Sequence, residues 1–193
     1  MEQPRRLILA STSRYRKALL QRLGLRFEVA APGIDEQALA GEPPEQTALR
    51  LSVLKARAVG AEYALVIGCD QVASLDGRPL GKPGNHENAA LQLRTLSGRT
   101  ADFHTALTLL DTSTGVHHSR VVPCQVTFRD LDARRIEAYL RREQPYDCAG
   151  SAKAEGLGIA LIARIETEDP TSLIGLPLIA LTEMLGRAGL PVL

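Results

Sequence analysis

The chain has 193 residues, of which 45% are hydrophobic and 23% are charged, and this balance is typical of a soluble globular protein. Lysine and arginine total 23 and aspartate and glutamate total 22, so a formal net charge of +1 excludes a strongly basic nucleic-acid coat and an acidic disordered chain. The sequence has no run of eighteen apolar residues, so we expect no transmembrane helix. Its length suits a single domain over residues 1–193.

Cysteine usage and the first apolar stretch bear on the compartment. The cysteines are Cys69, Cys124 and Cys148, which form no CxxC pair, so the sequence favours a reducing cytoplasm over a disulfide framework or a zinc site. The apolar stretch 7–10 is short and runs into Ser11, which is unlike a signal peptide. With aromatic residues at 4% and no tryptophan, we expect neither a nucleic-acid partner nor a membrane partner.

Apolar periodicity predicts alternating strands and helices in the first half of the chain. The elements expected there are, in chain order, a strand at 7–10, a helix at 16–23, a strand at 27–31, a helix at 45–63 and a strand at 64–69. The dipeptide Asp76-Gly77 predicts a hairpin turn between strands at 72–75 and 78–80.

The second half of the chain continues this alternation. The elements expected there are a helix at 85–96 with Asn85 as its cap, strands at 100–111 and 116–129, a helix at 132–142, an apolar β-branched stretch at 157–165 and a helix at 176–185 opened by Pro177. Hairpins make neighbouring strands antiparallel, so the sheet cannot be wholly parallel. We therefore expect an α/β fold with a mixed sheet.

The segment after the first predicted strand is the first candidate site. Ser11 and Ser13 follow the strand directly, and a helix begins at once with Arg14, Arg16 and Lys17 close by. A helix start offers free backbone N–H groups and a positive dipole end, so this segment could bind a phosphate. Taken alone, it reads more simply as a serine cap followed by a solvated basic turn.

Carboxylates and lysines at four further positions are candidates for chemistry. Asp70 ends a core strand, where ligands gather in α/β sheets, and it could bind a metal or deprotonate water. Glu36 lies in a loop, Lys55 lies in the long predicted helix, and Lys82 lies between a glycine and a proline that should stiffen its loop. Each of these residues alone is more commonly a turn former or a solvated surface group.

Other kinds of catalytic site lack support. The four histidines show no HExxH or comparable ligand spacing, which argues against a histidine metal site. There is no GxSxG motif and no cysteine in a recognisable nucleophile motif, so covalent catalysis is not favoured.

Taken together, these segments resemble the Maf family of cytoplasmic nucleoside triphosphate pyrophosphatases. The resemblance covers nearly the whole chain and keeps the order of the motifs. The matching segments are LILASTSRYRKALL at 7–20, the Asp35-Glu36 loop, LRLSVLKARAV at 49–59, VIGCDQV at 66–72, GKP at 81–83, LSG at 96–98, CAG at 148–150 and IGLPL at 174–178.

The resemblance implies a fold and a reaction. Maf and ITPase-like proteins have a mixed, partly antiparallel twisted sheet flanked by helices, with a cleft that holds the nucleotide. Such enzymes hydrolyse a nucleoside triphosphate to the monophosphate and pyrophosphate with a divalent cation, Mg²⁺ or Mn²⁺. Family members often pair as dimers, so a homodimer is a further expectation.

The resemblance also implies roles for individual residues. Ser11, Ser13, Arg16 and Lys55 match substrate-binding positions, and Asp70 matches the proton acceptor. Glu36 and Lys82 match further catalytic positions, and Asp70 and Glu36 are the expected metal ligands. The family's usual proline after the second serine is Arg14 here, and we expect the Arg14 side chain to point to solvent.

Three residues are expected to select the base. The combination of Tyr15, Gln71 and Glu155 resembles the 7-methyl-GTP pyrophosphatase subgroup, which more usually has tryptophan at the position of Tyr15. Methylation at N7 makes guanine cationic, and an aromatic face attracts a cation. Glu155 could accept from the N1–H and N2–H groups of guanine, and Gln71 could donate to its O6.

The leading hypothesis is an enzyme that hydrolyses 7-methyl-GTP to 7-methyl-GMP and pyrophosphate by water attack on the α-phosphate. Such an enzyme would prevent the incorporation of modified nucleotides. One alternative is a pyrophosphatase for dTTP, UTP or another non-standard nucleotide. A second alternative, from another class, is a nucleotide-binding regulator of septum formation and cell division, but a pure sensor would not need a water-activating carboxylate such as Asp70.

Overall fold

A computed structural model describes residues 5–193 and divides them into two compact units. The first unit comprises residues 5–71, 105–122 and 169–193, and the second comprises residues 72–104 and 123–168. The chain changes unit four times, three times within long strands and once between Glu168 and Asp169, just after β7 (Ile162–Thr167), so no linker marks the boundary. The three long strands are β3 (Ala64–Leu75), β5 (Thr100–Asp111) and β6 (His117–Phe128).

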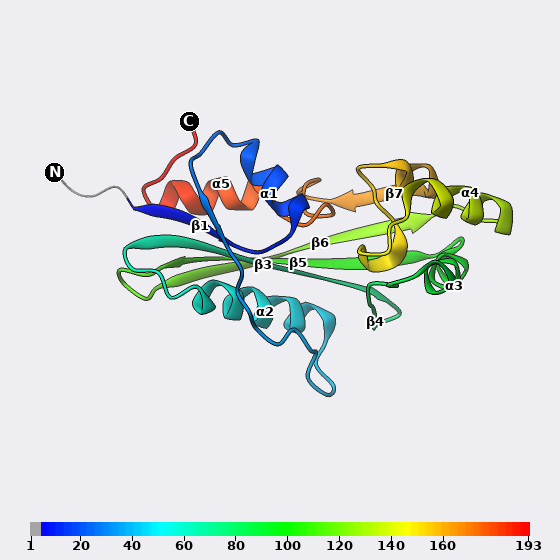
Figure 1. Ribbon diagram of the computed structural model, residues 1–193, viewed down its shortest axis with the longest axis horizontal. Helices are drawn as coiled ribbons and strands as arrows, with labels where there is room; N and C mark the ends of the chain where they lie inside the picture. The colour runs from blue at the N-terminus through cyan, green and yellow to red at the C-terminus, as the bar shows by residue number, and fades with distance from the viewer. Residues whose placement is uncertain (1–4) are drawn as a thin grey trace. The chain divides into compact units, whose positions relative to one another are not determined.

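The remaining elements belong to one unit each (Figure 1). The first unit holds β1 (Arg6–Ala10), α1 (Arg14–Gln21), β2 (Glu28–Ala30), α2 (Pro44–Ala58) and α5 (Leu178–Arg187). The second unit holds β4 (Arg78–Leu80), α3 (His86–Leu96), α4 (Ala133–Glu143), β7 (Ile162–Thr167) and the 3₁₀ turns η1 (Ala149–Ser151) and η2 (Leu157–Leu161).

The described strands form a seven-stranded mixed sheet, which confirms the expected α/β fold class. The strand order is β2-β1-β3-β5-β6-β7, with β4 paired to β3. The β1 strand is parallel to both β2 and β3, whereas the pairs β3–β4 and β6–β7 are antiparallel. The predicted hairpin turn at Asp76-Gly77 is confirmed, because both residues have positive φ between β3 and β4.

Side chains that alternate between the two faces of β1 and β3 belong to two hydrophobic cores of the first unit. Odd-numbered residues of β1 and β3, such as Leu7, Leu9 and Ile67, pack with the apolar faces of α1 and α5. Even-numbered residues, such as Ile8 and Val66, face the other way and pack with Ala56 of α2. Figure 1 shows the same arrangement, with α1 and α5 on one face of β1 and β3 and α2 on the other.

Most predicted elements are confirmed, and the differences lie at their ends. The long helix expected at 45–63 ends at Ala58, because Gly60 and Tyr63 take positive φ. The strand expected at 64–69 continues to Leu75, and the stretch 157–165 divides into η2 and the start of β7. Pro177 precedes α5 as its cap instead of lying inside it.

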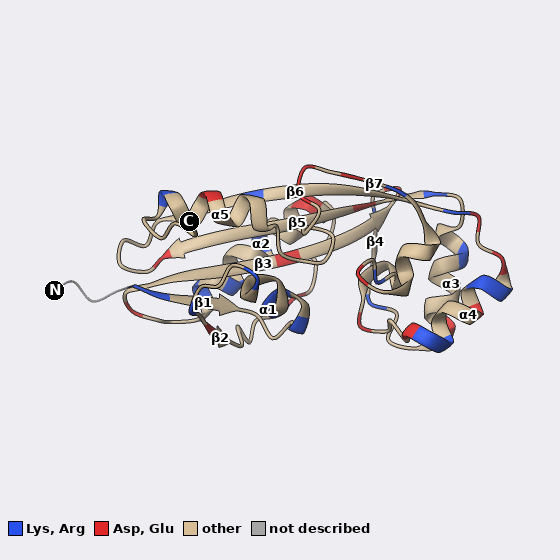
Figure 2. Cartoon of the chain, turned by 90° about the horizontal axis from the view of Figure 1, so that it is seen from above, with Lys and Arg blue, Asp and Glu red and all other residues tan. Residues whose placement is uncertain are grey.

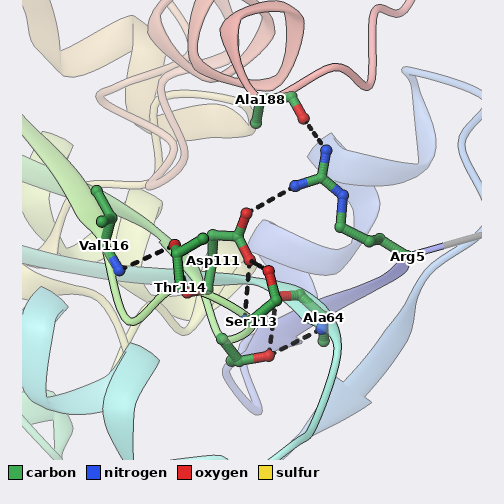
Figure 3. Close-up of polar contacts among 8 residues, drawn as sticks. Arg5, Ala64, Asp111, Ser113, Thr114, Val116 and Ala188 are labelled. Atoms are coloured by element: carbon green, nitrogen blue, oxygen red, sulfur yellow. Dashed lines mark hydrogen bonds and ion pairs between the residues drawn. The ribbon is translucent and has the colours of Figure 1, made fainter.

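The turn between β5 and β6 is tied to the start of β1 and the end of α5. Arg5 donates to the carboxylate of Asp111 at 2.7 Å and also to the carbonyl of Ala188 (Figure 3). Asp111 in turn accepts from the Ser113 hydroxyl at 2.6 Å, and Arg5 and Ser113 together hold the pKa of this carboxyl below its ordinary value. These contacts join three segments of the first unit that are far apart in the sequence.

Candidate active site

The end of β1 leads directly into α1 and places two serines in defined roles. Ser13 caps α1, and its hydroxyl oxygen accepts from the backbone N–H of Arg16. Ser11 is buried, and its hydroxyl oxygen accepts from the backbone N–H of Ser13 at 3.1 Å. The structure thus confirms a serine-capped helix start, and basic residues gather on α1 (Figure 2).

Arg16 is held across this turn by two contacts. Its Nε donates to the carbonyl of Gly175 at 2.9 Å, and its Nη1 lies 3.4 Å from the Ser11 hydroxyl. The guanidinium is therefore fixed beside the N-terminal end of α1. Burial raises the pKa of Asp70, and the charge of Arg16 partly opposes that rise. A fixed guanidinium next to a helix N-terminus is a suitable arrangement for binding phosphate oxygens.

The close approach of α2 to β3 brings Lys55 to the same end of the sheet. A Cβ on Gly68 would lie 2.0 Å from the Ser52 carbonyl oxygen and 2.8 Å from the Ala56 nitrogen, so only glycine fits where the helix crosses the strand. Parallel pairing sets Ala10 opposite Gly68. The residues that follow each of these positions therefore emerge at neighbouring places on the sheet.

Lys55 joins the two carboxylates that the sequence singled out. Its Nζ lies 2.6 Å from Oδ1 of Asp70 and 3.0 Å from Oε1 of Glu36. Lys55 and Asp70 are buried, whereas the side chain of Glu36 is 56% exposed. Three of the predicted residues from distant parts of the chain therefore form one cluster.

Burial and charge oppose each other at Asp70. Removal of its carboxylate from water raises the pKa, while the ammonium of Lys55 and the more distant Arg16 lower it, and the net shift is upward from the ordinary carboxyl value. A buried carboxylate with a raised pKa and a defined charge partner is the kind of group that can take a proton from water.

The loop that carries Glu36 is fastened to α2 by a second ion pair. Arg50 donates through Nε and Nη2 to the two carboxylate oxygens of Glu42, both at 2.7 Å, and also to the carbonyl of Gln37 at 3.0 Å. Glu42 also accepts from the hydroxyl of Thr47. Arg50 is the largest cause that lowers the pKa of Glu42, which falls to about 2.

Arg14 is exposed and packs on its neighbour Tyr15. Its side chain is exposed, but its guanidinium carbon lies 4.8 Å from the centre of the Tyr15 ring, and its Nη2 donates to the Tyr15 hydroxyl at 2.7 Å. The side chain thus lies at the solvent-exposed surface, as expected, and it also packs on Tyr15. An arginine packs readily on an aromatic face, because the ring quadrupole attracts its charge.

Gln71 has one amide orientation, because its Nε2 faces three acceptors. The Thr105 hydroxyl and the Ser172 carbonyl each lie 2.9 Å from Nε2, and the Leu173 carbonyl lies at 3.2 Å. Two of these partners are carbonyl oxygens, which can only accept. Both Nε2 hydrogens are thereby engaged within the protein, and the carbonyl Oε1 is the atom left for a ligand. The expected donation from Gln71 to guanine O6 would require Nε2 to leave these partners, and it stays a prediction.

Lys82 belongs to the second unit, in the loop between β4 and α3. The backbone of this loop is tied at three points. Gln92 donates to the Gly81 carbonyl, Asn88 donates to the Pro83 carbonyl, and the Gly84 N–H donates to the carbonyl of Tyr146. The side chain of Lys82 is exposed, and its loop is fastened, as the flanking glycine and proline predicted.

Glu155 is also in the second unit, in a short segment fastened to α4. Glu143 accepts from the ammonium of Lys153 and from the backbone N–H of Leu157, both at 2.7 Å. The hydroxyl of Tyr139 accepts from the backbone N–H of Lys153. The exposed Glu155 therefore lies on a braced turn and not on a loose loop.

A hollow of about 330 Å³ occurs elsewhere in the first unit. It is lined by residues at the start of β1, around the β5–β6 turn and at the end of α5, including Arg5, Asp111 and Arg187. None of the residues predicted for catalysis or binding lines it.

Several residues around the cluster were not singled out from the sequence. They are Glu42, Arg50, Thr105, Asp169, Thr171 and Gly175. Their contacts bridge long sequence separations, such as 159 residues between Arg16 and Gly175. Two of them lie in matched segments, Arg50 in the one at 49–59 and Gly175 in the one at 174–178, but neither segment indicated a role for them.

Comparison with known proteins decides the family. A profile of the family described as Maf-like protein matches residues 6–188. The chain belongs to the Maf family. The resemblance noted in its motifs is thereby confirmed over nearly the whole sequence.

Relatives in this family share more than half of their residues with the chain. The 7-methyl-GTP pyrophosphatase of Cupriavidus pinatubonensis is 60% identical over 188 residues, covering 96% of this chain and 94% of that protein. The protein of the same name from Thiobacillus denitrificans is 60% identical over 189 residues, covering 97% and 94%. Among solved structures, a HAM1 protein from Coxiella burnetii has a TM-score of 0.46 at 17% identity, covering 65% of this chain and 73% of that one.

Proposed function

We propose that this Maf-family chain is a nucleoside triphosphate pyrophosphatase that hydrolyses 7-methyl-GTP to 7-methyl-GMP and pyrophosphate. Relatives of 60% identity over nearly the full length carry the name 7-methyl-GTP pyrophosphatase. One structural observation supports the reaction most directly. The buried Asp70 is held by Lys55 in the same unit as a serine-capped helix start and a fixed arginine.

The phosphate chain binds at the start of α1 in this proposal. The backbone N–H groups of the first turn, the hydroxyls of Ser11 and Ser13 and the guanidinium of Arg16 all donate hydrogen bonds or supply positive charge there. Lys55 adds a second positive charge, and Lys82 of the second unit is assigned a phosphate oxygen on its family match. Charge stabilisation of this kind is a large part of phosphoryl-transfer catalysis.

Asp70 acts as the general base. A water oxygen forms a bond to the α-phosphorus, the bond between that phosphorus and the bridging oxygen breaks, and pyrophosphate leaves. The proton of the water passes to the Asp70 carboxylate. Burial raises the pKa of this carboxyl, and Lys55, at 2.6 Å, opposes that rise.

Asp70 and Glu36 are suited to hold a divalent cation together with substrate. Mg²⁺ is commonly bound by one or two carboxylates plus substrate phosphates, and these two carboxylates lie around one ammonium, that of Lys55. Among residues 5–193 no group of three or more His, Cys, Asp or Glu side chains is placed to hold a metal without substrate. When bound, the cation would neutralise charge that develops on the phosphate oxygens.

Base selection is assigned to Tyr15, Gln71 and Glu155. A cation, that of Arg14, already lies over the ring of Tyr15, so this ring can accept the positive charge of 7-methylguanine in the same way. The Oε1 of Gln71 would accept from a guanine N–H, because its Nε2 is engaged elsewhere. The exposed carboxylate of Glu155 would accept a second N–H.

Two further features belong to this proposal. We assign the protein to the cytoplasm, where its nucleotide substrate is found, and its cysteines are all free thiols, of which Cys69 and Cys124 are buried. Over residues 5–193 no helix has the length and apolarity needed to span a bilayer. The homodimer expected from the family remains a prediction, as does the organisation as one domain.

The test is a substrate panel with wild-type protein. 7-Methyl-GTP, GTP, dTTP, UTP and CTP are each supplied with Mg²⁺ or Mn²⁺, and pyrophosphate release is followed. We expect the highest kcat/KM for 7-methyl-GTP, and we expect the oxygen of ¹⁸O-labelled water to appear in the monophosphate. Preference for dTTP or UTP would contradict the base assignment alone, and release of orthophosphate would contradict the reaction. Nucleotide binding without turnover under either metal would favour a regulator.

A further inference from the structure

The segment 169–177, called the 169–177 loop below, has no role in the reaction as described so far. It contains most of the IGLPL motif and leads into α5. Gly175 within it has a φ of +122°, which is strained for any residue with a side chain. The loop is therefore built to one particular backbone shape.

Asp169 holds this shape through both oxygens of a carboxylate that is only 2% exposed. Its Oδ1 accepts from the hydroxyl of Thr171 at 2.6 Å and from the backbone N–H of Thr171 at 3.1 Å. Its Oδ2 accepts from the first-turn N–H groups of Ile179, at 2.7 Å, and Ala180, at 3.4 Å. Pro177 at the cap position makes no side-chain hydrogen bond, so Asp169 caps α5 from outside the helix.

Three carbonyl groups of the loop face residues of the candidate site. The Gly175 carbonyl accepts from Nε of Arg16 at 2.9 Å. The Ser172 and Leu173 carbonyls accept from Nε2 of Gln71. The loop therefore orients both the guanidinium assigned to phosphate and the amide assigned to the base.

We infer that Asp169 is a positioning residue that, through the 169–177 loop, orients Arg16 for the triphosphate and Gln71 for the base. The assignment rests on the proposed function for what Arg16 and Gln71 bind. It goes beyond that function because one carboxylate that touches no substrate controls both ends of the nucleotide site. If Asp169 were only a helix cap, its loss would weaken α5 and leave phosphate binding and base preference unchanged.

Thr105 provides a way to test the base end of the nucleotide site, at Gln71, separately from the phosphate end, at Arg16. Its buried hydroxyl accepts from Nε2 of Gln71 and donates to the Ser172 carbonyl, whereas Arg16 is held by the Gly175 carbonyl and the Ser11 hydroxyl. Replacing it with the similarly shaped valine removes its contacts with Gln71 and Ser172, and it should loosen Gln71 while the contact between Gly175 and Arg16 remains. Thr105→Ser keeps the hydroxyl and should restore the wild-type behaviour.

The experiment compares Asp169→Asn with Thr105→Val in the full chain. Binding of inorganic triphosphate, measured by calorimetry, reports the phosphate end, and the ratio of kcat/KM for 7-methyl-GTP to that for UTP reports the base end. In Asp169→Asn we expect both to fall about tenfold, since each end loses roughly one well-oriented hydrogen bond. In Thr105→Val we expect only the ratio to fall.

The control is Glu183→Gly, which weakens α5 at an exposed position outside the loop. It should lower Tm and leave both readouts at wild-type values. If Asp169→Asn behaves like this control, the inference is overturned. If Asp169→Asn does not fold, Thr171→Val takes its place, because the Thr171 hydroxyl links Asp169 to the N–H of Leu178, and wild-type readouts in that variant would overturn the inference equally.

A readout independent of turnover separates this inference from the proposed function. The side-chain amide protons of Gln71, identified by their loss in Gln71→Glu, should exchange slowly in the NMR spectrum of the wild-type protein and faster in Asp169→Asn. Unchanged exchange would overturn the positioning role even if 7-methyl-GTP is hydrolysed. Faster exchange, with no hydrolysis of 7-methyl-GTP by the wild-type protein, would support the positioning and contradict the function.

Discussion

At the scale of single residues, the buried ammonium of Lys55 explains how Asp70 and Glu36 come to share a site. A charge in the interior is costly unless it is paired, and Lys55 is only 3% exposed. It is paired with one buried and one exposed carboxylate. The pairing also makes the ionisation of Asp70 depend on Lys55, which gives a test through pH.

Replacement of Lys55 by glutamine should move the acid limb of the kcat/KM profile to higher pH. A general base loses activity as the pH falls through its pKa, and the pKa of Asp70 already lies above its ordinary value because of burial. Lys55 lowers that pKa, so removing its charge raises the pKa further. The profile is measured with 7-methyl-GTP at saturating metal.

Lys55→Arg serves as the control for this change. It keeps the positive charge, so its acid limb should stay near that of the wild-type protein even if kcat falls. An acid limb in Lys55→Gln that coincides with the wild-type one would show that Asp70 is not the group that titrates.

Residue types at the site could be predicted from the sequence, but their partners could not. Ser11, Arg16 and Asp70 stand at ends of predicted elements, where chemistry is expected. The orientation of Gln71 depends on Thr105 and on the Ser172 carbonyl, and the latter is 101 residues away. No local pattern encodes such a contact, so the engagement of its Nε2 within the protein could not be predicted.

At the scale of elements, the packing of α2 on β3 sets the distance between Lys55 and Asp70. Gly68 lets the helix backbone approach the strand, and the residues of α2 that face the strand are small, namely Ser52 and Ala56. Periodicity predicted both elements. It could not predict their separation, because a glycine within a strand pattern indicates only some close approach.

Gly68→Ala should therefore destabilise the protein strongly. The added Cβ would meet the backbone carbonyl of Ser52 at 2.0 Å, and backbone cannot move aside cheaply. We expect the free energy of unfolding, measured by urea denaturation, to fall by about 3 kcal/mol. Activity should fall as well, because the helix must shift and carry Lys55 away from Asp70.

Gly186→Ala is the matched control for this substitution. Gly186 lies within α5, and nothing lies within 4 Å of where its Cβ would be. Alanine there should raise the free energy of unfolding by about 1 kcal/mol through helix propensity. Equal stability of the wild-type and Gly68→Ala proteins would mean that α2 does not pack against β3 as described.

At the scale of the whole molecule, the sequence predicted a mixed α/β fold and the structure confirms it. The two compact units could not be predicted, because composition marks a boundary only where a linker exists. Here three of the four changes of unit lie within β3, β5 and β6, and the fourth follows β7 directly. The matched motifs are distributed over both units. Family membership could be predicted from the sequence, because it depends on the order of these motifs along the chain.

The central claim is that this Maf-family chain is an enzyme in which Asp70 activates water, and not a protein that only binds nucleotide. The most direct measurement is made on Asp70→Asn, in which the turnover of 7-methyl-GTP and its binding are determined on the same preparation. We expect kcat to fall by about 10²–10⁴-fold, the range for loss of a general base, while 7-methyl-GTP still binds and the fold is retained. Turnover by Asp70→Asn at the wild-type rate would contradict the account.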